Sequence, residues 1–271
     1  MDAPAVNTIN AMLGNSSRCA AIEWALTGGS IAIDAGIVFA VGGAAASITL
    51  SGRPVEMWQP HHASAGEILE LSAPGGGRFS YLAIAGGIES PVVMGSRSTY
   101  TAGGFGGHEG RRLRNDDALP IGATATKRRH QVSDPLPGKL RPPVSLDVIR
   151  YVARDGVTLA RDWKISAASD RTGYRLESDA SAEGESIISE CVGPGVIQLP
   201  PGGSPIVLMA DAPTIGGYRI AGGVISHDLG AFAQRVPGDA IALEPIPVEH
   251  AQRELERDAE RVETVREWSL A

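Results

Sequence analysis

Short apolar runs and alternating segments, separated by glycine or polar turns, dominate the chain from residue 20 onward. Each is of strand length, and alternation places every second side chain on one face of a sheet. The segments are residues 20–26, 31–41, 46–50, 68–71 and 81–85 in the first half and 144–152, 174–176, 195–199 and 205–210 in the second. This pattern predicts a mainly β protein with few short helices.

Helical periodicity is confined to the two ends of the chain. Near the N-terminus, apolar side chains recur at helical spacing over residues 5–15, and Gly14-Asn15 is a typical helix stop. Residues 248–271 repeat apolar side chains at spacings of three and four among many charges, which predicts an amphipathic helix. Its narrow seam is expected to dock on the body of the protein, with a partner interface as the alternative. The seam residues are Val248, Ala251, Leu255, Ala259, Val262 and Val265.

Three segments share a local pattern in which an acidic turn residue leads into alternating aliphatic residues. They are residues 66–71, 116–121 and 238–243. The acid can accept backbone hydrogen bonds in the turn, while the alternation buries one side chain in two. We therefore expect repeated strands of a barrel or sandwich at all three places.

A proline-rich stretch at residues 133–143 separates two halves of the chain, each of which closes with one of these segments, 116–121 and 238–243. Proline cannot continue a helix or donate to a sheet ladder, so this stretch is the expected linker. The predicted organisation is a first domain at residues 1–134, a second at 144–247 and a helical tail at 248–271.

Composition narrows the function classes. A hydrophobic content of 43% with 20% charged residues is typical of a globular protein, and no apolar run reaches the ~18 residues that cross a bilayer. The N-terminus lacks a secretory pattern, so a cytoplasmic location is expected. A net charge of −7 opposes general nucleic-acid binding.

Cys19 and Cys191 show no metal-ligand spacing, and we expect two buried thiols and no metal.

The densest chemistry lies at residues 95–111, where serine, threonine, arginine and closely spaced glycines follow one another. One interpretation is a glycine-rich hairpin with scattered surface arginine. The other is an anion or carbonyl cradle, in which backbone N–H groups, Ser96, Ser98 and Thr99 donate while Arg97 supplies a bidentate fork. The chain carries no Gly-x-x-x-x-Gly-Lys-Ser/Thr motif, so this is not a nucleotide-binding P-loop.

Two further segments of the second half combine strand pattern with polar groups. Strand alternation over residues 170–176 places Arg171 and Arg175 on one face and Tyr174 on the other, either as ordinary surface charge or as a row facing an anionic ligand. Asp211 follows the apolar strand at 205–210, where it either makes local turn hydrogen bonds or presents chemistry at a strand end.

Seven of these motifs occur in one order, and together they resemble the carboxyltransferase subdomain A and B family, also called allophanate hydrolase subunit 2. Any one motif is weak, but the ordered set over roughly residues 1–245 is specific. The motifs are Leu13-Gly14-Asn15, residues 81–88, Gly95-Ser96-Arg97-Ser98-Thr99, residues 170–176, residues 197–203, Gly216-Gly217-Tyr218 and residues 234–239.

The resemblance implies two cyclophilin-like β-barrel domains and a C-terminal amphipathic helix. It also implies an ATP-dependent 5-oxoprolinase complex, whose C subunit works with the B and A subunits to open the 5-oxoproline lactam to L-glutamate. An unstrained lactam is a poor electrophile, so phosphorylation of its carbonyl oxygen with ATP would activate it, and cationic or N–H donors must stabilise the resulting charge.

Under this resemblance Arg97 and Asp211 are the expected catalytic residues, with Asp211 as the acid or base. The substrate, an amide or carboxylate, is expected at Ser96, Ser98, Thr99, Arg171, Tyr174, Arg175, Thr214, Gly216, Gly217 and Tyr218.

The chain departs from the family pattern in three places. Family members begin with an additional segment carrying a Gln-Asp-Leu-Gly-Arg-like motif, so we expect a shortened chain or a misplaced start codon here. Where the family has a Gly-Asp turn, this sequence has Asp116-Asp117. The family's Thr-Thr-Gly-Gly-Tyr motif is Thr-Ile-Gly-Gly-Tyr here, so Ile215 replaces a threonine and one hydroxyl is lost.

Two other functions stay open from the sequence. One is the carboxyltransferase component of a biotin-dependent urea carboxylase or allophanate hydrolase-type system; the chain has no Met-Lys-Met biotinylation motif, so the biotin carrier would come from elsewhere. The other is a non-catalytic regulatory partner of a B subunit that resembles a kinase inhibitor.

Overall fold

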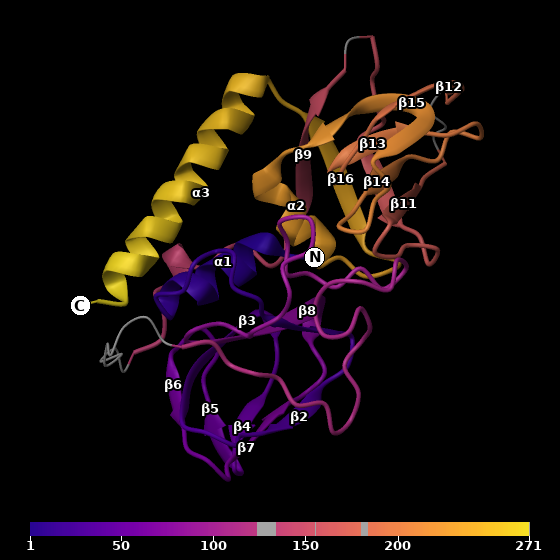
Figure 1. The fold of residues 1–271 in the computed structure, drawn as a ribbon. Helices are drawn as coiled ribbons and strands as arrows, with labels where there is room; N and C mark the ends of the chain where they lie inside the picture. The colour runs from indigo at the N-terminus through magenta and orange to yellow at the C-terminus, as the bar shows by residue number, and fades with distance from the viewer. Residues whose placement is uncertain (124–133, 155, 180–183, 271) are drawn as a thin grey trace. The chain divides into compact units, whose positions relative to one another are not determined.

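A computed structural model describes residues 1–123, 134–154, 156–179 and 184–270 (Figure 1). The chain forms two compact units. The N-terminal unit comprises residues 3–142 and 260–271, and the barrel unit comprises residues 1–2 and 143–259. The expected mainly β fold, with few helices and a C-terminal one, is confirmed. The domain limits expected from the sequence stay a prediction, because the units are defined by contacts and not by independent folding.

The N-terminal unit is built from two four-stranded sheets that share one apolar core. The first has the order β1 (Ile22–Ala25), β8 (Gly75–Ile84), β3 (Ile37–Ala45) and β6 (His61–Ala63); the second has the order β2 (Gly29–Ala32), β7 (Ile68–Leu71), β4 (Ile48–Leu50) and β5 (Arg53–Val55). Phe39 and Leu82 from the first sheet are buried in one cluster with Leu50 and Leu69 from the second. Their burial stabilises the unit, since each fully buried side chain of this size contributes roughly 1.5–3 kcal/mol.

Helix α1 (Ala3–Met12) packs on the first sheet through Ile9 and Met12, which are fully buried. A close approach of the helix to strand β3 requires glycine at position 42. A Cβ on Gly42 would lie 2.7 Å from Cγ2 of Ile9 and 2.8 Å from the ring of Trp58. The helix ends at Gly14, which takes the left-handed φ of 68° that favours glycine. The helix and its stop were predicted from the sequence.

The proline-rich segment is anchored to the N-terminal unit over its described residues. Leu136 is fully buried, and its N–H donates to the carbonyl oxygen of Trp58 at 2.6 Å. A 3-10 turn, η1 (Gly138–Leu140), follows, and the two units change over between Pro142 and Pro143. Ser133, the first residue of the expected linker, lies outside the described residues. Among the described residues of the segment, Leu136 and Pro142 are buried and residues 134, 135 and 137–139 are exposed, so the linker stays a prediction and is anchored at these two points.

Seven strands of the barrel unit form a closed ring. In order around the ring they are β15 (Ile215–Val224), β13 (Val196–Leu199), β14 (Ile206–Leu208), β11 (Gly173–Glu177), β10 (Asp162–Ile165), β16 (Ala240–Pro245) and β9 (Val148–Ala153), which pairs again with β15. Neighbours are antiparallel except β9 and β16, which are parallel. An eighth strand, β12 (Ser186–Cys191), pairs with the outer end of β15. The ring encloses the second core, which includes Tyr151, Trp163, Ile197 and Leu243.

Strand β15 bends where it passes from β12 to β9. Gly222 has a φ of 155°, and a Cβ there would lie 2.3 Å from the carbonyl oxygen of Val152 on β9. A register shift between Ile197 and Gln198 marks the same region of the partner strand β13. Bulges and glycines of this kind let a sheet close on itself.

A short helix, α2 (Ser226–Ala233), follows β15 and carries a buried carboxylate. The side chain of Asp228 is 0% exposed and accepts three hydrogen bonds from Arg150 on β9: from the backbone N–H at 2.7 Å, Nε at 3.1 Å and Nη2 at 2.7 Å. A buried carboxylate needs such partners because its desolvation is otherwise uncompensated. The pair fixes α2 on the barrel.

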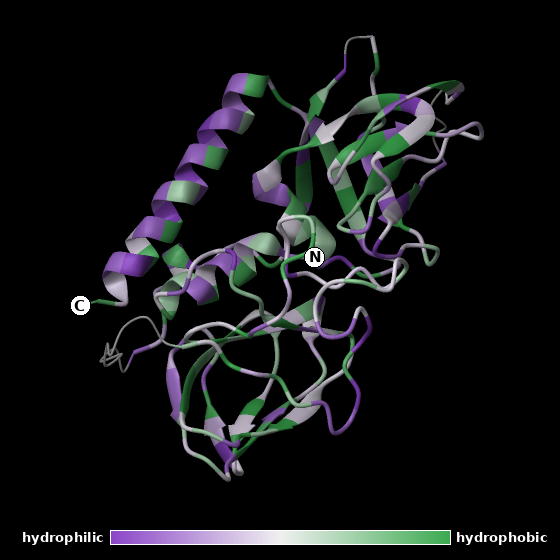
Figure 2. Ribbon diagram, in the orientation of Figure 1, coloured by the Kyte–Doolittle hydropathy of each residue, from purple (hydrophilic) through white to green (hydrophobic). Residues whose placement is uncertain are grey.

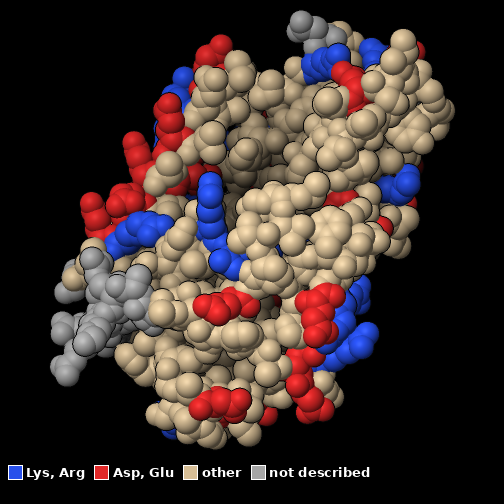
Figure 3. Space-filling model, viewed as in Figure 1, with Lys and Arg blue, Asp and Glu red and all other residues tan. Residues whose placement is uncertain are grey.

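The C-terminal helix α3 (Val248–Trp268) divides between the units, with residues 248–259 in the barrel unit. Figure 2 shows it as largely hydrophilic with apolar residues at intervals, and Figure 3 shows acidic and basic side chains along it. Val265 of the predicted seam is fully buried, but Val248 and Leu255 are 47% and 57% exposed. The docking of the whole seam, as predicted, is therefore wrong for the first part of the helix.

Polar contacts hold that first part instead. Asp258 lies 3.0 Å from Nδ1 of His227 on α2, and Glu254 lies 3.7 Å from Arg150. These partners come from β9 and α2, so the helix is tied to the same cluster that contains Asp228.

The His227–Asp258 pair makes stability depend on pH. The hydrogen bond that the His227 ring donates to Asp258 raises the pKa of His227 above its ordinary value; the charge of Asp228 reinforces this effect, and burial and Arg150 oppose it. A raised pKa means that this contribution is fully present below the unfolded-state value of about 6.5 and is lost as pH rises through the folded-state value. We expect the free energy of unfolding to fall across that window. Urea denaturation at several pH values should show a weaker fall in Asp258→Asn; an identical pH profile in the two proteins would contradict the assignment.

Two other sequence expectations are wrong. Residues 116–121 form no strand in the described structure: Asp116 takes a left-handed φ of 69°, and Ile121 makes only an isolated bridge with Ile88. Cys191 is exposed and Cys19 is partly exposed, so neither is the buried thiol that was expected.

Within the described residues, none of the helices is both long enough and apolar enough to pass through a bilayer.

Candidate functional site

Arg171 and Asp211, both predicted site residues, form an ion pair in the barrel unit. Nε of Arg171 donates to Oδ2 of Asp211 at 2.9 Å and Nη2 donates to Oδ1 at 3.2 Å, so both carboxylate oxygens are held by one planar guanidinium. The Asp211 side chain is 14% exposed and the Arg171 side chain 36%. Two bonds in parallel fix the orientation of the carboxylate, which a single contact would leave free to rotate.

The ladder between β11 and β14 brings these two residues together. Arg171 precedes β11 and Asp211 follows β14, and the antiparallel register pairs Gly173 with Leu208. The backbone N–H of Asp211 donates to the carbonyl oxygen of Arg171 at 2.9 Å. Asp170 shapes the turn, because its Oδ1 accepts the N–H groups of Thr172 and Gly173. The site is therefore presented by a rigid strand pair.

The alternation predicted for this strand is confirmed, and it corrects one residue of the predicted site. Arg175 is exposed, whereas Tyr174 and Leu176 are 0% exposed. The Tyr174 hydroxyl donates to the carbonyl oxygen of Ala233 at 2.7 Å, and its ring lies 5.3 Å from that of Phe232. Tyr174 is a core residue with no surface to offer a ligand, so its placement in the substrate site does not agree with the structure.

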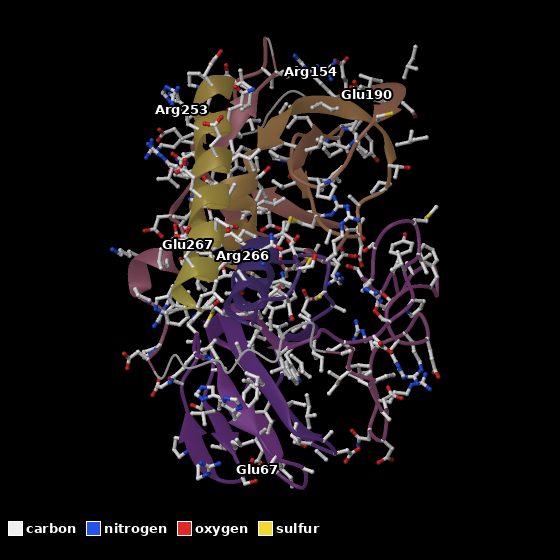
Figure 4. All side chains as sticks on the ribbon, turned by 60° about the vertical axis from the view of Figure 1, so that its left-hand side comes forward. Glu67, Arg154, Glu190, Arg253, Arg266 and Glu267 are labelled. Atoms are coloured by element: carbon white, nitrogen blue, oxygen red, sulfur yellow. The ribbon has the colours of Figure 1, made fainter. Side chains whose placement is uncertain are left out.

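The Gly-Gly-Tyr motif lies on the outer end of β15, next to β12. Gly216 is opposite Glu190, and Tyr218, opposite Ser186, is 39% exposed. Thr214 is exposed just before the strand. Glu190 forms an ion pair with Arg154 at 2.8 Å, and Figure 4 shows these two labelled side chains near each other beside the strands.

Residues 95–111, in the N-terminal unit, form a compact loop and not a regular hairpin. Its bridges join Val93 to Ser96 and Tyr100 to Phe105. Glycine is required where the loop folds on itself: a Cβ on Gly107 would lie 1.8 Å from Oγ1 of Thr99. The hydroxyl of Ser96 accepts the backbone N–H of Ser98 at 3.1 Å, so Ser96 stabilises the loop.

The two arginines of this loop are both engaged. Nη1 of Arg97 donates to the carbonyl oxygen of Ser90, which ties the proposed cationic fork to the backbone of its own loop. Arg111 bridges Glu109 and Asp117 at 2.6 and 2.7 Å. The Arg111 hydrogen bond holds the pKa of the Asp117 carboxyl well below its usual range, helped by the N–H of Arg114. The sequence pattern made Asp117 a turn acid that accepts backbone hydrogen bonds, as it does from Arg114, but gave no signal of its pair with Arg111.

The residues expected at the site thus fall into two groups. Arg171, Arg175, Asp211, Thr214, Gly216, Gly217 and Tyr218 belong to the barrel unit, and Arg97, Ser96, Ser98 and Thr99 belong to the N-terminal unit. The structure brings Arg171 and Asp211 into direct contact. Among the described residues, no group of three or more histidine, cysteine, aspartate or glutamate side chains is arranged to hold a metal ion.

The mainly β fold in two units, the closed barrel of the second unit and the order of the site residues along the chain together point to one class of protein. Residues 1–245 match the family described as carboxyltransferase domain, subdomain A and B, and the chain belongs to that family. The resemblance found in the sequence is confirmed.

Curated relatives are similar over nearly the whole chain. The chain is 33% identical over 277 residues to the 5-oxoprolinase C subunit of Escherichia coli (strain K12), an alignment that covers 100% of this chain and 89% of the relative. It is 32% identical over 265 residues to the 5-oxoprolinase C subunit of Haemophilus influenzae, covering 93% of this chain and 84% of the relative.

A solved structure shares the fold within a much longer protein. The K. lactis urea amidolyase superposes with a TM-score of 0.89 at 25% identity, covering 100% of this chain. The chain spans only 18% of the length of that protein.

Proposed function

We propose that the chain is the C subunit of an ATP-dependent 5-oxoprolinase, which works with a B and an A subunit to convert 5-oxoproline to L-glutamate. ATP is proposed as a co-substrate of the complex and not as a ligand of this chain alone. The cytoplasmic location expected from the sequence is part of the same proposal.

Full-length similarity to the C subunits of 5-oxoprolinases supports this proposal. The alignment covers 89% of the Escherichia coli relative, whereas the alignment to the Lachancea kluyveri urea amidolyase covers 16% of that protein. The chain therefore resembles the former over most of its length and the latter over one part of its length.

The reaction requires groups that stabilise negative charge and one group that donates or accepts a proton. Transfer of the γ-phosphoryl group of ATP to the lactam oxygen releases ADP and activates the carbon. One water adds to that carbon and the C–N bond breaks, which frees the amine and leaves an acyl phosphate; a second water hydrolyses the acyl phosphate to glutamate and phosphate. Asp211, held by Arg171, is the candidate acid or base because its orientation is fixed by two bonds. Exposed Arg175 is a candidate for the substrate carboxylate. Arg97 keeps its proposed catalytic role as a donor, with Ser98 and Thr99 beside it.

Reconstitution tests the proposal. The chain, co-expressed with the A and B subunits, is expected to form glutamate and phosphate from 5-oxoproline and ATP, with no product when either is omitted. Omitting this chain should abolish turnover. A stable complex with the B subunit that never turns over would support the regulatory alternative instead.

The carboxyltransferase alternative has its own support in the structural match to the K. lactis urea amidolyase. It predicts that carboxybiotin, supplied by a separate biotin carboxylase and carrier, transfers its carboxyl group to urea in the presence of the chain. Transfer of labelled carbonate with urea, together with no reaction on 5-oxoproline, would favour it.

A further inference from the structure

A buried amide in the barrel unit lacks a hydrogen-bond partner. Gln198 on β13 is 4% exposed, and its Nε2 has no acceptor among the described residues. Leaving a buried donor unsatisfied costs about 1–3 kcal/mol, so such a group calls for an explanation. Neither the family motif nor the proposed site assigns it a role.

The register of the sheet places Gln198 on the face that carries the Gly-Gly-Tyr motif. Gln198 is opposite Ile220 on β15, and opposite residues share a face. Alternation along β15 puts Tyr218 and Gly216 on that face as well. The neighbouring residues Ile197 and Leu199 point the other way, into the barrel core.

The end of the Gln198 side chain lies directly against Gly216. A Cβ added to Gly216 would lie 2.2 Å from Nε2 of Gln198, a distance that no side chain tolerates without movement. Glycine at this position therefore leaves the space that the amide occupies, on the strand where Tyr218 is partly exposed.

We propose that Gln198 is a substrate-binding residue that recognises the amide edge of the substrate. This inference rests on the proposed function and adds the group that selects an amide. A lactam ring holds its N–H and C=O on the same edge, and a primary carboxamide presents one donor and one acceptor on the same edge. Nε2 donates to the lactam carbonyl oxygen and Oε1 accepts the lactam N–H. A ligand carbonyl thus supplies the acceptor that the free chain lacks.

The variant Gln198→Met tests this in the reconstituted complex. Methionine keeps the length of the side chain and removes both hydrogen-bonding groups. We expect KM for 5-oxoproline to rise about tenfold with kcat within about twofold, the signature of lost uniform binding. The melting temperature should stay the same or rise, because the unsatisfied amide is gone. Gly216→Ala, which pushes the amide aside, should also raise KM.

Several outcomes would overturn the inference. A higher melting temperature with unchanged KM and kcat in Gln198→Met would show that the amide is only an unsatisfied structural group. A lower melting temperature with unchanged KM in Gly216→Ala would assign the contact to packing alone.

Binding of 5-oxoproline measured calorimetrically without ATP separates this inference from the proposed function. Wild-type binding that Gln198→Met weakens supports the inference even in a complex that shows no turnover. Wild-type turnover with equal binding by both proteins refutes the inference and leaves the proposed function intact.

Discussion

Asp228→Ala is expected to lower the free energy of unfolding by about 3–5 kcal/mol, the range for removing one partner of a buried ion pair. The carboxylate is 0% exposed, and it accepts both the side chain and the backbone N–H of Arg150. Alanine would leave these donors without their acceptor and would open a cavity between β9 and α2. Urea denaturation of the purified chain, monitored by tryptophan fluorescence, measures the change.

An ion pair whose carboxylate is exposed, although its arginine is 11% exposed, provides the control. Asp147 also accepts from an arginine, Arg235, at 3.1 Å, but its side chain is 96% exposed. Exposed pairs contribute at most about 1 kcal/mol, so Asp147→Ala should change stability little. Equal effects of the two substitutions would show that burial of Asp228 does not set its contribution.

Arg171→Ala is expected to lower kcat/KM of the reconstituted complex by about 10²-fold, because a misplaced catalytic group loses roughly that factor. The two bonds from Arg171 hold both carboxylate oxygens of Asp211 and so fix its plane. Arg171→Lys keeps the charge but not the fork, so it should recover only part of the activity. Asp211→Asn should lose at least as much as Arg171→Ala.

Separate measurement of kcat and KM distinguishes positioning from simple structure. If Arg171 orients Asp211 for the chemical step, Arg171→Ala should lower kcat and leave KM for 5-oxoproline less changed. The control is Arg161→Ala, whose pair with Glu244 at 3.9 Å is exposed on both sides. If the activity of Arg171→Ala is within about twofold of this control, the Arg171–Asp211 pair is not part of the active site.

The alternation of apolar and polar residues predicted the strands in which every second side chain faces a single core. In β11 the alternation alone placed Tyr174 and Leu176 opposite Arg175, as the structure has them. The alternation put Tyr174 on the face away from the arginines, but the burial of that face in the barrel core is seen only in the structure. The run at 31–41 predicts one strand, but a turn divides it between β2 and β3 because Asp34 to Gly36 break the pattern.

Contacts between distant segments could not be predicted. Arg171 and Asp211 were both candidates, yet their pairing depends on the β11–β14 register, which the sequence does not display. The acidic turn at 116–121 failed for a related reason: Asp117 is engaged by Arg111 and by the N–H of Arg114, which stabilises a coil where a strand was expected. Helix α2 was not predicted, because a helix of eight residues is too short to show a clear helical repeat of apolar side chains.

The parallel pairing of β9 with β16 joins the first and the last strand of the barrel along the chain. The ring therefore cannot close on the ribosome until residue 245 has been synthesised, and every earlier intermediate exposes an unpaired strand edge. Such non-local closure is typical of β proteins that fold in milliseconds to seconds. Until β16 is available, the ring stays open between β10 and β9, and the facing edges of these two strands lack the partner that joins them.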